Sequence, residues 1–335
     1  MNPFLRYRRL ILPATILLGV AASMALIERT WETTIIRREN AQFVPCQTVT
    51  GGVAYIPAGR FLMGSEAHYA DERPQQAVEV AAFDIDRFEV TNAQFAQFVA
   101  ETGYVTSAER ATALGFPANG SAVFDHSYWS FVEGADWRHP EGPDSSIEGK
   151  ERDPVVQVSL EDAEAYADWA GRALPTEAQW EYATRGGLDG QEYAWGDALT
   201  PGGNYLANTW QGLFPIADTG ADGHTGRAEV GCYAANGYGL YDMIGNVWEW
   251  TQDPYFPDHR FGDDLPVDAH ERLTGFDPRQ PGVPVGIIKG GSFLCAPNGC
   301  RRYRPAARHA QETGLGTNHI GFRTVSRDLA DGDRQ

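Results

Sequence analysis

Three segments of the chain carry apolar residues at helical spacing between a capping residue and a glycine. Each begins after a hydroxyl side chain that can cap a helix, at Thr91, Ser159 and Thr176. Glycines at 103 and 186 stand where the first and third patterns end, as is common at helix C-termini. The patterns therefore predict three helices that begin and end at these residues.

Alternating residues predict strands before the first of these helices. Residues 51–65 (GGVAYIPAGRFLMGS) alternate small, apolar and polar side chains between glycines, which predicts a β-hairpin. Residues 78–90 predict a further strand, and residues 188–322 predict only turns and short strands. Because residues 46–323 contain no low-complexity tract and no clear repeat, we expect one domain over residues 46–327. Residues 31–45 predict a polar tether, and residues 328–335 predict a frayed tail.

The N-terminal region 1–30 is the most apolar part of the chain. Arg6, Arg8 and Arg9 precede an uninterrupted apolar run over residues 10–27. As a helix this run would rise about 27 Å, close to the hydrocarbon thickness of a bilayer. It predicts a membrane anchor with the following chain outside the cytoplasm. A cleaved signal peptide is the alternative, with residues 23–25 as its small-residue site. Both interpretations predict an exported, extracytoplasmic or periplasmic domain.

The overall charge limits the partners. The formal net charge is −18, so the surface repels phosphate backbones, and we expect no nucleic-acid partner. Hydrophobic residues make up 42% of the chain, which is enough for a packed core. We expect a monomer with a solvated acidic surface.

Two of the four cysteines lie close together, in KGGSFLCAPNGCRRYRPAAR over residues 289–308. The Pro-Asn-Gly sequence between Cys295 and Cys300 favours a chain reversal that brings the two sulfurs together. Such a pair forms either a disulfide, as is common in exported proteins, or a thiolate clamp for a soft metal. Two thiolates without histidine or carboxylate favour copper(I) over zinc, which takes four ligands. Cys46 and Cys232 remain as a second possible disulfide, although the sequence does not show that they meet.

Five blocks together resemble the formylglycine-generating, sulfatase-modifying enzymes. In order they are WRHPEGPDSSI (137–147), ALPTEAQWEYATRGGL (173–188), NGYGLYDMIGNVWEWTQD (236–253), the cysteine block (289–308) and IGFR (320–323). The resemblance extends over residues 53–323. It implies an α+β fold, a single compact domain of the C-type-lectin-like kind that is rich in loops and poor in helices.

The resemblance also implies an activity. Enzymes of this family oxidise one cysteine of an unfolded sulfatase, in a Cys-x-Pro-x-Arg segment, to Cα-formylglycine with O₂ and copper(I). Cys295 and Cys300 match the copper-binding cysteines. Ser292 and Trp248 match two other active-site positions; without the resemblance, Ser292 is equally well a turn residue and Trp248 a core residue.

Two structural calcium sites are implied as well, built from the oxygen ligands that hard cations prefer. The first maps to the side chains of Asn208 and Asp222 and the carbonyls of Thr209 and His224. The second maps to the side chains of Asp242 and Glu249 and the carbonyls of Gly245 and Val247.

The match departs from the family mainly between the two cysteines. Relatives often carry His-x-Ser-Tyr there, whereas this chain has Ala-Pro-Asn-Gly over residues 296–299. Gly299 provides no aromatic ring, and residue 319 is histidine where relatives often have asparagine. Because of these differences the resemblance does not identify the client protein. Two alternatives remain. One is another oxidase on the same scaffold, similar to the pyoverdine-maturation proteins. The other is a non-catalytic lectin-like binding module in which Cys295 and Cys300 form a disulfide.

Overall fold

The computed structural model describes residues 46–48, 51–110, 119–125, 128–259 and 271–327. The chain divides into two units, Met1–Phe43 and Val44–Gln335, and all the described residues belong to the second. The predicted anchor, the predicted tether and the predicted tail lie outside the described residues. Within the described ranges, no helix combines the length and the apolar character needed to cross a bilayer.

Three principal helices occur where the sequence predicts them. They are α2 (Asn92–Thr102), α3 (Leu160–Trp169) and α4 (Glu177–Arg185), and each has a complete capping box at its N-terminus. Gly103 and Gly186 adopt the left-handed conformation that ends α2 and α4, with φ of 67° and 58°. Shorter helical segments are α5 (Glu271–Thr274) and the 3₁₀ turns η1 (Ala70–Glu72) and η2 (Pro201–Gly203).

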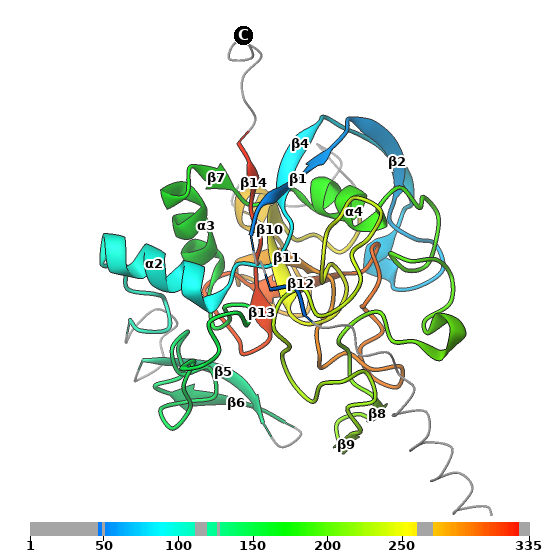
Figure 1. Cartoon of the computed structure of the whole chain (residues 1–335). Helices are drawn as coiled ribbons and strands as arrows, with labels where there is room; N and C mark the ends of the chain where they lie inside the picture. Colours follow the sequence, from blue (N-terminus) through cyan, green and yellow to red (C-terminus); the bar gives the residue numbers. More distant parts are fainter. Residues whose placement is uncertain (1–45, 49–50, 111–118, 126–127, 260–270, 328–335) are drawn as a thin grey trace, which may run out of the picture. The chain divides into compact units, whose positions relative to one another are not determined.

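The strands form two four-stranded sheets and three ribbons (Figure 1). The first sheet has the order β1 (Val53–Ile56), β4 (Phe83–Asp86), β14 (Val325–Ser326), β7 (Arg172–Ala173). The second has the order β12 (Arg308–Glu312), β11 (Val285–Lys289), β10 (Trp248–Pro254), β13 (Ile320–Gly321). The ribbons pair β2 (Gly59–Met63) with β3 (Gln76–Val80), β5 (Gly120–Asp125) with β6 (Tyr128–Glu133), and β8 (Gly212–Leu213) with β9 (Ala217–Asp218).

The predicted hairpin over residues 51–65 is wrong. Both strands exist, but β1 pairs with β4 and β2 pairs with β3. The alternation identified the strands correctly and carried no information about their partners. Ile56 and Phe61 are both buried in one apolar cluster with Ile85, so burial against distant residues selects the pairing.

Two apolar clusters hold the unit together. The larger one includes Phe95 of α2, Tyr166 of α3 and Trp250 of the second sheet, and the fully buried Trp250 also donates its indole N–H to Val158 O at 3.0 Å. The smaller one packs α4 against the first sheet through Trp180 and Ile85. The second sheet and α4 together support the segment that carries the two neighbouring cysteines.

Candidate active site

The cysteine segment connects the neighbouring strands β11 and β12 of the second sheet, and its two ends are paired residues. Lys289 ends β11 and Arg308 begins β12, and the two residues lie opposite each other in the antiparallel register. Residues 290–307 therefore form a closed excursion whose two ends are fixed by one pair of neighbouring strands. Gly290 and Gly291 begin it with φ of 96° and 75°, a left-handed conformation that disfavours side chains with a Cβ.

Within this excursion the sulfur atoms of Cys295 and Cys300 face each other. Both cysteines are free thiols, and their Sγ atoms are 2.6 Å apart. As predicted, the intervening turn brings them together, with Gly299 N–H donating to Ala296 O at 3.1 Å. Cys295 is buried and Cys300 is half-buried, whereas residues 297–299 are exposed. The pair is thus reached from solvent on the Cys300 side.

The two thiols differ in acidity. Burial raises the pKa of the Cys295 thiol well above its usual value. The pKa of Cys300 is lowered, first by the hydrogen bond from Cys295 and then by the backbone N–H of Arg302 and the charges of Arg302 and Arg304. Cys300 is therefore the more acidic of the two thiols.

Most of the arginines that follow the cysteines are ion-paired rather than free. Arg302 binds Asp71 at 2.9 Å, and Arg304 binds Glu72 at 2.5 Å, both carboxylates belonging to η1. Arg301, which is exposed, lies 3.7 Å from Glu192. The 3₁₀ turn η1 therefore anchors the second half of the cysteine excursion through two charge pairs that are largely removed from solvent.

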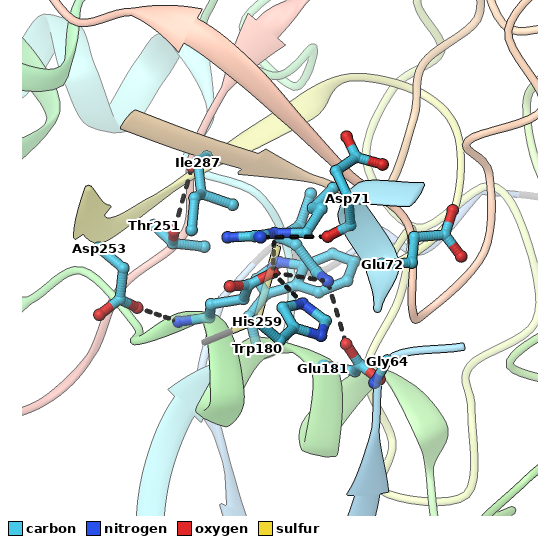
Figure 2. A network of polar contacts seen from close by, with 12 residues as sticks. Gly64, Asp71, Glu72, Trp180, Glu181, Thr251, Asp253, His259 and Ile287 are labelled. Carbon is cyan, nitrogen blue, oxygen red and sulfur yellow. Dashed lines mark hydrogen bonds and ion pairs between the residues drawn. The ribbon is translucent and has the colours of Figure 1, made fainter. Parts of the chain in front are cut away.

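A buried carboxylate holds the base of the excursion. Glu177 Oε1, at the start of α4, lies 2.9 Å from Arg308 Nε and 3.4 Å from Lys289 Nζ, so it contacts both ends. Lys289 also reaches Glu181 Oε2 at 3.1 Å, one turn further along α4. His259 Nε2 lies 3.5 Å from Glu177, and Figure 2 shows this polar network from close by, with His259 and Glu181 labelled. Lys289, Glu177 and Glu181 are almost completely excluded from solvent.

The charges of this network determine its ionisation. Burial alone would raise the pKa of Glu177, but Arg308 and Lys289 outweigh burial and lower it. Burial is likewise outweighed at Glu181, where Lys289 and Arg185 lower the pKa. Both carboxyls are therefore ionised at neutral pH. This network was not predicted from the sequence, where its one signal is a lysine at the end of the apolar run of β11.

The two remaining residues predicted for the active site are both buried. Ser292 is fully buried; its Oγ accepts from Leu294 N–H at 3.2 Å, and its carbonyl accepts from Cys295 N–H at 2.9 Å. Trp248 belongs to the same apolar cluster as Cys295 and stacks on His309 with ring centroids 5.8 Å apart. Burial lowers the pKa of His309 to about 4, so this ring is neutral at physiological pH.

Two of the residues predicted for the first calcium site donate backbone hydrogen bonds to the carboxylate of a third. Asp222 accepts from Thr209 N–H at 2.8 Å and from His224 N–H at 3.2 Å. Asn208 directs its amide hydrogens to Gly226 O and Asn246 Oδ1, which leaves its side-chain oxygen for another partner. Burial raises the pKa of Asp222 to about 6, the effect expected of a buried carboxylate without a nearby cation.

The residues predicted for the second site lie in a denser polar region. Asp242 accepts from Gly231 N–H at 2.5 Å, and burial raises its pKa to about 6. Glu249 is already engaged by Arg323, with two contacts of 2.7 Å, and by Trp180 Nε1 at 2.8 Å. A third buried carboxylate, Glu89, which the sequence did not single out, has its pKa raised by burial and by the charges of Asp242 and Glu249.

Gly245 and Val247, whose carbonyls were predicted to complete the second calcium site, lie just before β10. Gly245 N–H donates to Gly290 O at 3.0 Å, and Val247 is buried directly before β10. Within the described ranges, no three His, Cys, Asp or Glu side chains gather as a metal cluster. The predicted sites are instead a pair of thiols and two mixed sets of carboxylates, an amide and carbonyls.

Cys46 and Cys232, which sequence analysis left unassigned, form a disulfide across 186 positions of the chain. The bond ties the start of the described unit to the segment that precedes Asp242. It also removes these two cysteines from the candidate chemistry.

Comparison with known proteins agrees with this geometry. A family model described as a sulfatase-modifying factor enzyme 1-like domain matches residues 40–328. The formylglycine-generating enzyme of Mycobacterium tuberculosis is 49% identical over 294 residues, covering 81% of this chain and 96% of the relative. The chain belongs to the formylglycine-generating enzyme family. The Thermomonospora curvata enzyme of the same name is 46% identical, with 84% of this chain and 96% of the relative covered.

The solved structure of PvdO from Pseudomonas aeruginosa has a TM-score of 0.55 and 24% identity over 82% of this chain and 93% of that one. This likeness concerns the fold, and it agrees with the predicted loop-rich α+β domain with few helices.

Overall similarity does not separate active from inactive relatives of the formylglycine-generating enzymes. Proteins named inactive Cα-formylglycine-generating enzyme 2 are 38% identical in Mus musculus and 42% identical in Bos taurus. The Mus musculus formylglycine-generating enzyme itself is 42% identical. Activity therefore has to be argued from the thiol pair and its surroundings.

Proposed function

We propose that this chain oxidises a cysteine in a Cys-x-Pro-x-Arg segment of an unfolded sulfatase to Cα-formylglycine, using O₂ and a copper(I) ion. The observation that carries the proposal is the facing pair of free thiols at Cys295 and Cys300, one of which is half-buried beside an exposed turn.

The donor set fits copper(I). Two sulfurs that converge without a histidine or carboxylate between them suit a soft ion of low coordination number. When bound, such an ion supplies one-electron chemistry with O₂. Cys300 gives up its proton more readily, because the hydrogen bond from Cys295 and then Arg302 and Arg304 lower its pKa, and both thiols must lose their protons to bind the ion. Ser292, whose carbonyl accepts from Cys295 N–H, is fully buried, and Trp248 belongs to the apolar cluster that includes Cys295.

The overall reaction requires an external reductant. The client thiol loses its sulfur as hydrogen sulfide, and its carbon becomes an aldehyde, which takes two electrons from the client. Dioxygen accepts four electrons when one oxygen atom enters the aldehyde and the other becomes water. A thiol reductant therefore supplies the other two electrons and is oxidised to a disulfide.

Substitution of each thiol separately tests this assignment. We expect Cys295→Ser and Cys300→Ser each to abolish O₂ consumption and aldehyde formation with a Cys-x-Pro-x-Arg peptide and copper-loaded protein. Mass spectrometry of the peptide identifies the aldehyde directly. Full turnover in either variant would refute the proposal. A double Cys46→Ser/Cys232→Ser variant serves as the control, because it removes two cysteines and leaves the thiol pair intact.

Copper uptake separates the proposed oxidase from a binding module. The oxidase binds one copper(I) per chain and loses it when either Cys295 or Cys300 is replaced. A chain that takes up no copper and holds the two cysteines as a stable disulfide after isolation would instead be a binding module. A copper-binding chain that leaves sulfatase peptides unchanged would favour another oxidase on this scaffold.

We further propose two structural calcium ions in this chain. The buried Asp222 and Asp242 carboxylates support the proposal, because each has a raised pKa that a bound cation would lower. Glu249 fits less well, since its oxygens already bind Arg323 and Trp180. Isothermal titration of chelator-treated protein measures the number of ions bound.

We also propose that the domain acts outside the cytoplasm and is tethered by the N-terminal apolar run. The Cys46–Cys232 disulfide supports this location, because such bonds persist in oxidising compartments. Fractionation of cells that express the full chain, with and without residues 1–30, tests both the location and the tether.

A further inference from the structure

Aromatic side chains from three separate segments gather beside the thiol pair. Phe124 of β5 stacks on Phe214 with ring centroids 5.5 Å apart and meets Trp129 of β6 edge to face at 5.4 Å. Trp210 meets Phe214 edge to face at 5.1 Å. These four residues are called the aromatic platform below. Its members are half-buried or exposed, and Trp129 is 46% exposed. Exposed aromatic clusters of this kind are typical of binding surfaces.

The aromatic platform is joined to the thiol turn by specific contacts. Asn298 lies between the two cysteines; its Nδ2 donates to Phe214 O at 3.0 Å, and its Oδ1 accepts from Phe214 N–H at 3.3 Å. On the other side, Trp210 N–H donates to Cys295 O at 3.0 Å. The platform and the thiols are therefore positioned by the same hydrogen bonds, which makes the platform continuous with the reaction site.

Phe214 occupies the space into which a side chain at residue 299 would project. A Cβ built on Gly299 would lie 3.1 Å from Cδ1 of Phe214 and 3.5 Å from its Cγ. Gly299 is exposed and its φ lies outside the left-handed region, so its backbone accepts a side chain. The glycine leaves room for the Phe214 ring, one residue away from Cys300.

We propose that Phe214 is a specificity-determining residue that binds an apolar side chain of the client, next to the client cysteine. This inference rests on the proposed function, because the client is the peptide whose cysteine reaches the thiol pair. An extended peptide with its cysteine at Cys300 passes over residues 297–299 and meets the Phe214 ring within one residue of its reacting sulfur. Because Asn298 holds both polar backbone atoms of Phe214, the ring is fixed before the client arrives, which reduces the entropy lost on binding.

Binding of a non-reactive peptide tests the inference without copper or turnover. The probes are fluorescent Cys-x-Pro-x-Arg peptides in which serine replaces the reacting cysteine and leucine or glycine occupies each flanking position. We expect the full chain to prefer a leucine peptide over its glycine counterpart. Phe214→Ala should weaken binding of that leucine peptide about tenfold, the order expected for loss of one large apolar contact, and should abolish the preference.

A matched control and a rescue variant separate recognition from folding. Ile216→Ala changes a residue of the same ribbon that is 75% exposed, and we expect its affinity to stay within about twofold of the wild type. The double variant Phe214→Ala/Gly299→Phe should recover most of the lost affinity, since its new ring enters the space left by the first. Circular dichroism melting of all three variants establishes that they fold.

The possible results distinguish failure of this inference from failure of the proposed function. Wild-type protein that binds the serine peptides and converts their cysteine counterparts, together with Phe214→Ala protein that shows the same affinity and preference, overturns the role of Phe214 alone. Wild-type protein that neither binds the serine peptides nor converts their cysteine counterparts overturns both. A concentration-dependent dimer that Phe214→Ala abolishes would make a second copy of the chain the occupant, and would overturn the inference as well.

Discussion

Replacement of Lys289 by methionine should weaken the base of the cysteine excursion. Lys289 is fully buried and contacts Glu177 at 3.4 Å and Glu181 at 3.1 Å. Methionine fills a similar volume but leaves both carboxylates with one cation fewer. Removal of one partner from a buried ion pair typically costs about 3–5 kcal/mol. For a domain of this size, that loss corresponds to a melting temperature lower by roughly 10 °C.

The pH dependence of this loss is also determined by the network. The pKa values of Glu177 and Glu181 are lowered in the folded protein, so the stability they contribute is present above the unfolded-state value of 4.5 and is lost as pH falls through the folded-state values. Without the charge of Lys289 both folded-state pKa values rise. The difference in stability between wild type and Lys289→Met should therefore be largest near neutral pH and shrink as pH falls through the folded-state pKa values of the two carboxyls.

Calorimetry across this pH range provides the measurement. Lys150→Met is the matched control, because Lys150 is the only other lysine in the chain and is exposed. We expect it to change the melting temperature by no more than about 2 °C. Equal melting temperatures for Lys289→Met and the wild type at neutral pH would refute the stabilising role of Lys289 in this network. So would a difference that grows as pH falls.

Three further outcomes follow from the described contacts. If a cation binds at Asp222, whose pKa of about 6 is raised by burial, chelation should lower the melting temperature more as pH rises from 5 to 7.5, and an effect of chelation independent of pH would contradict this. Replacement of Cys46 and Cys232 by alanine should lower stability by about 3–5 kcal/mol because the closed loop is long, while aldehyde formation below the melting point persists; urea unfolding curves measure the first effect. Ser159→Ala removes the cap of α3 and should cost about 1 kcal/mol in the same unfolding assay, with unchanged stability as the opposing result.

Local sequence chemistry predicted the helices well because their boundaries are local. Thr91, Ser159 and Thr176 each cap a helix through contacts three residues away, and glycine ends two of these helices. The strands were predicted less well, since a strand is recognised from alternation but its partner is chosen by burial. β1 and β2 are adjacent in sequence and pair with β4 and β3 instead of with each other.

In the candidate site, too, features that depend on neighbouring residues were predicted, and contacts between distant parts of the sequence were missed. The turn between Cys295 and Cys300 was predicted because five residues contain all that is needed for the reversal. The carboxylates that hold the excursion were missed, because Asp71 and Glu72 lie more than two hundred residues from their arginine partners. Phe214 and Asn298 were missed for the same reason, since 84 residues separate them.

The buried charges at the two ends of residues 290–307 explain how an exposed turn can keep two sulfur atoms facing each other. Lys289 and Arg308 are neighbours across the β11–β12 rung, so their like charges would force the strands apart if both were unpaired. Glu177 lies between them and attracts both. This attraction offsets the repulsion and holds the two ends of residues 290–307 together. Farther along, Arg302 and Arg304 bind η1, and beside the hydrogen bond from Cys295 their charges help to lower the pKa of Cys300. The same cations thus hold the segment in place and make Cys300 the more acidic thiol, so loss of a single carboxylate partner should change both geometry and acidity.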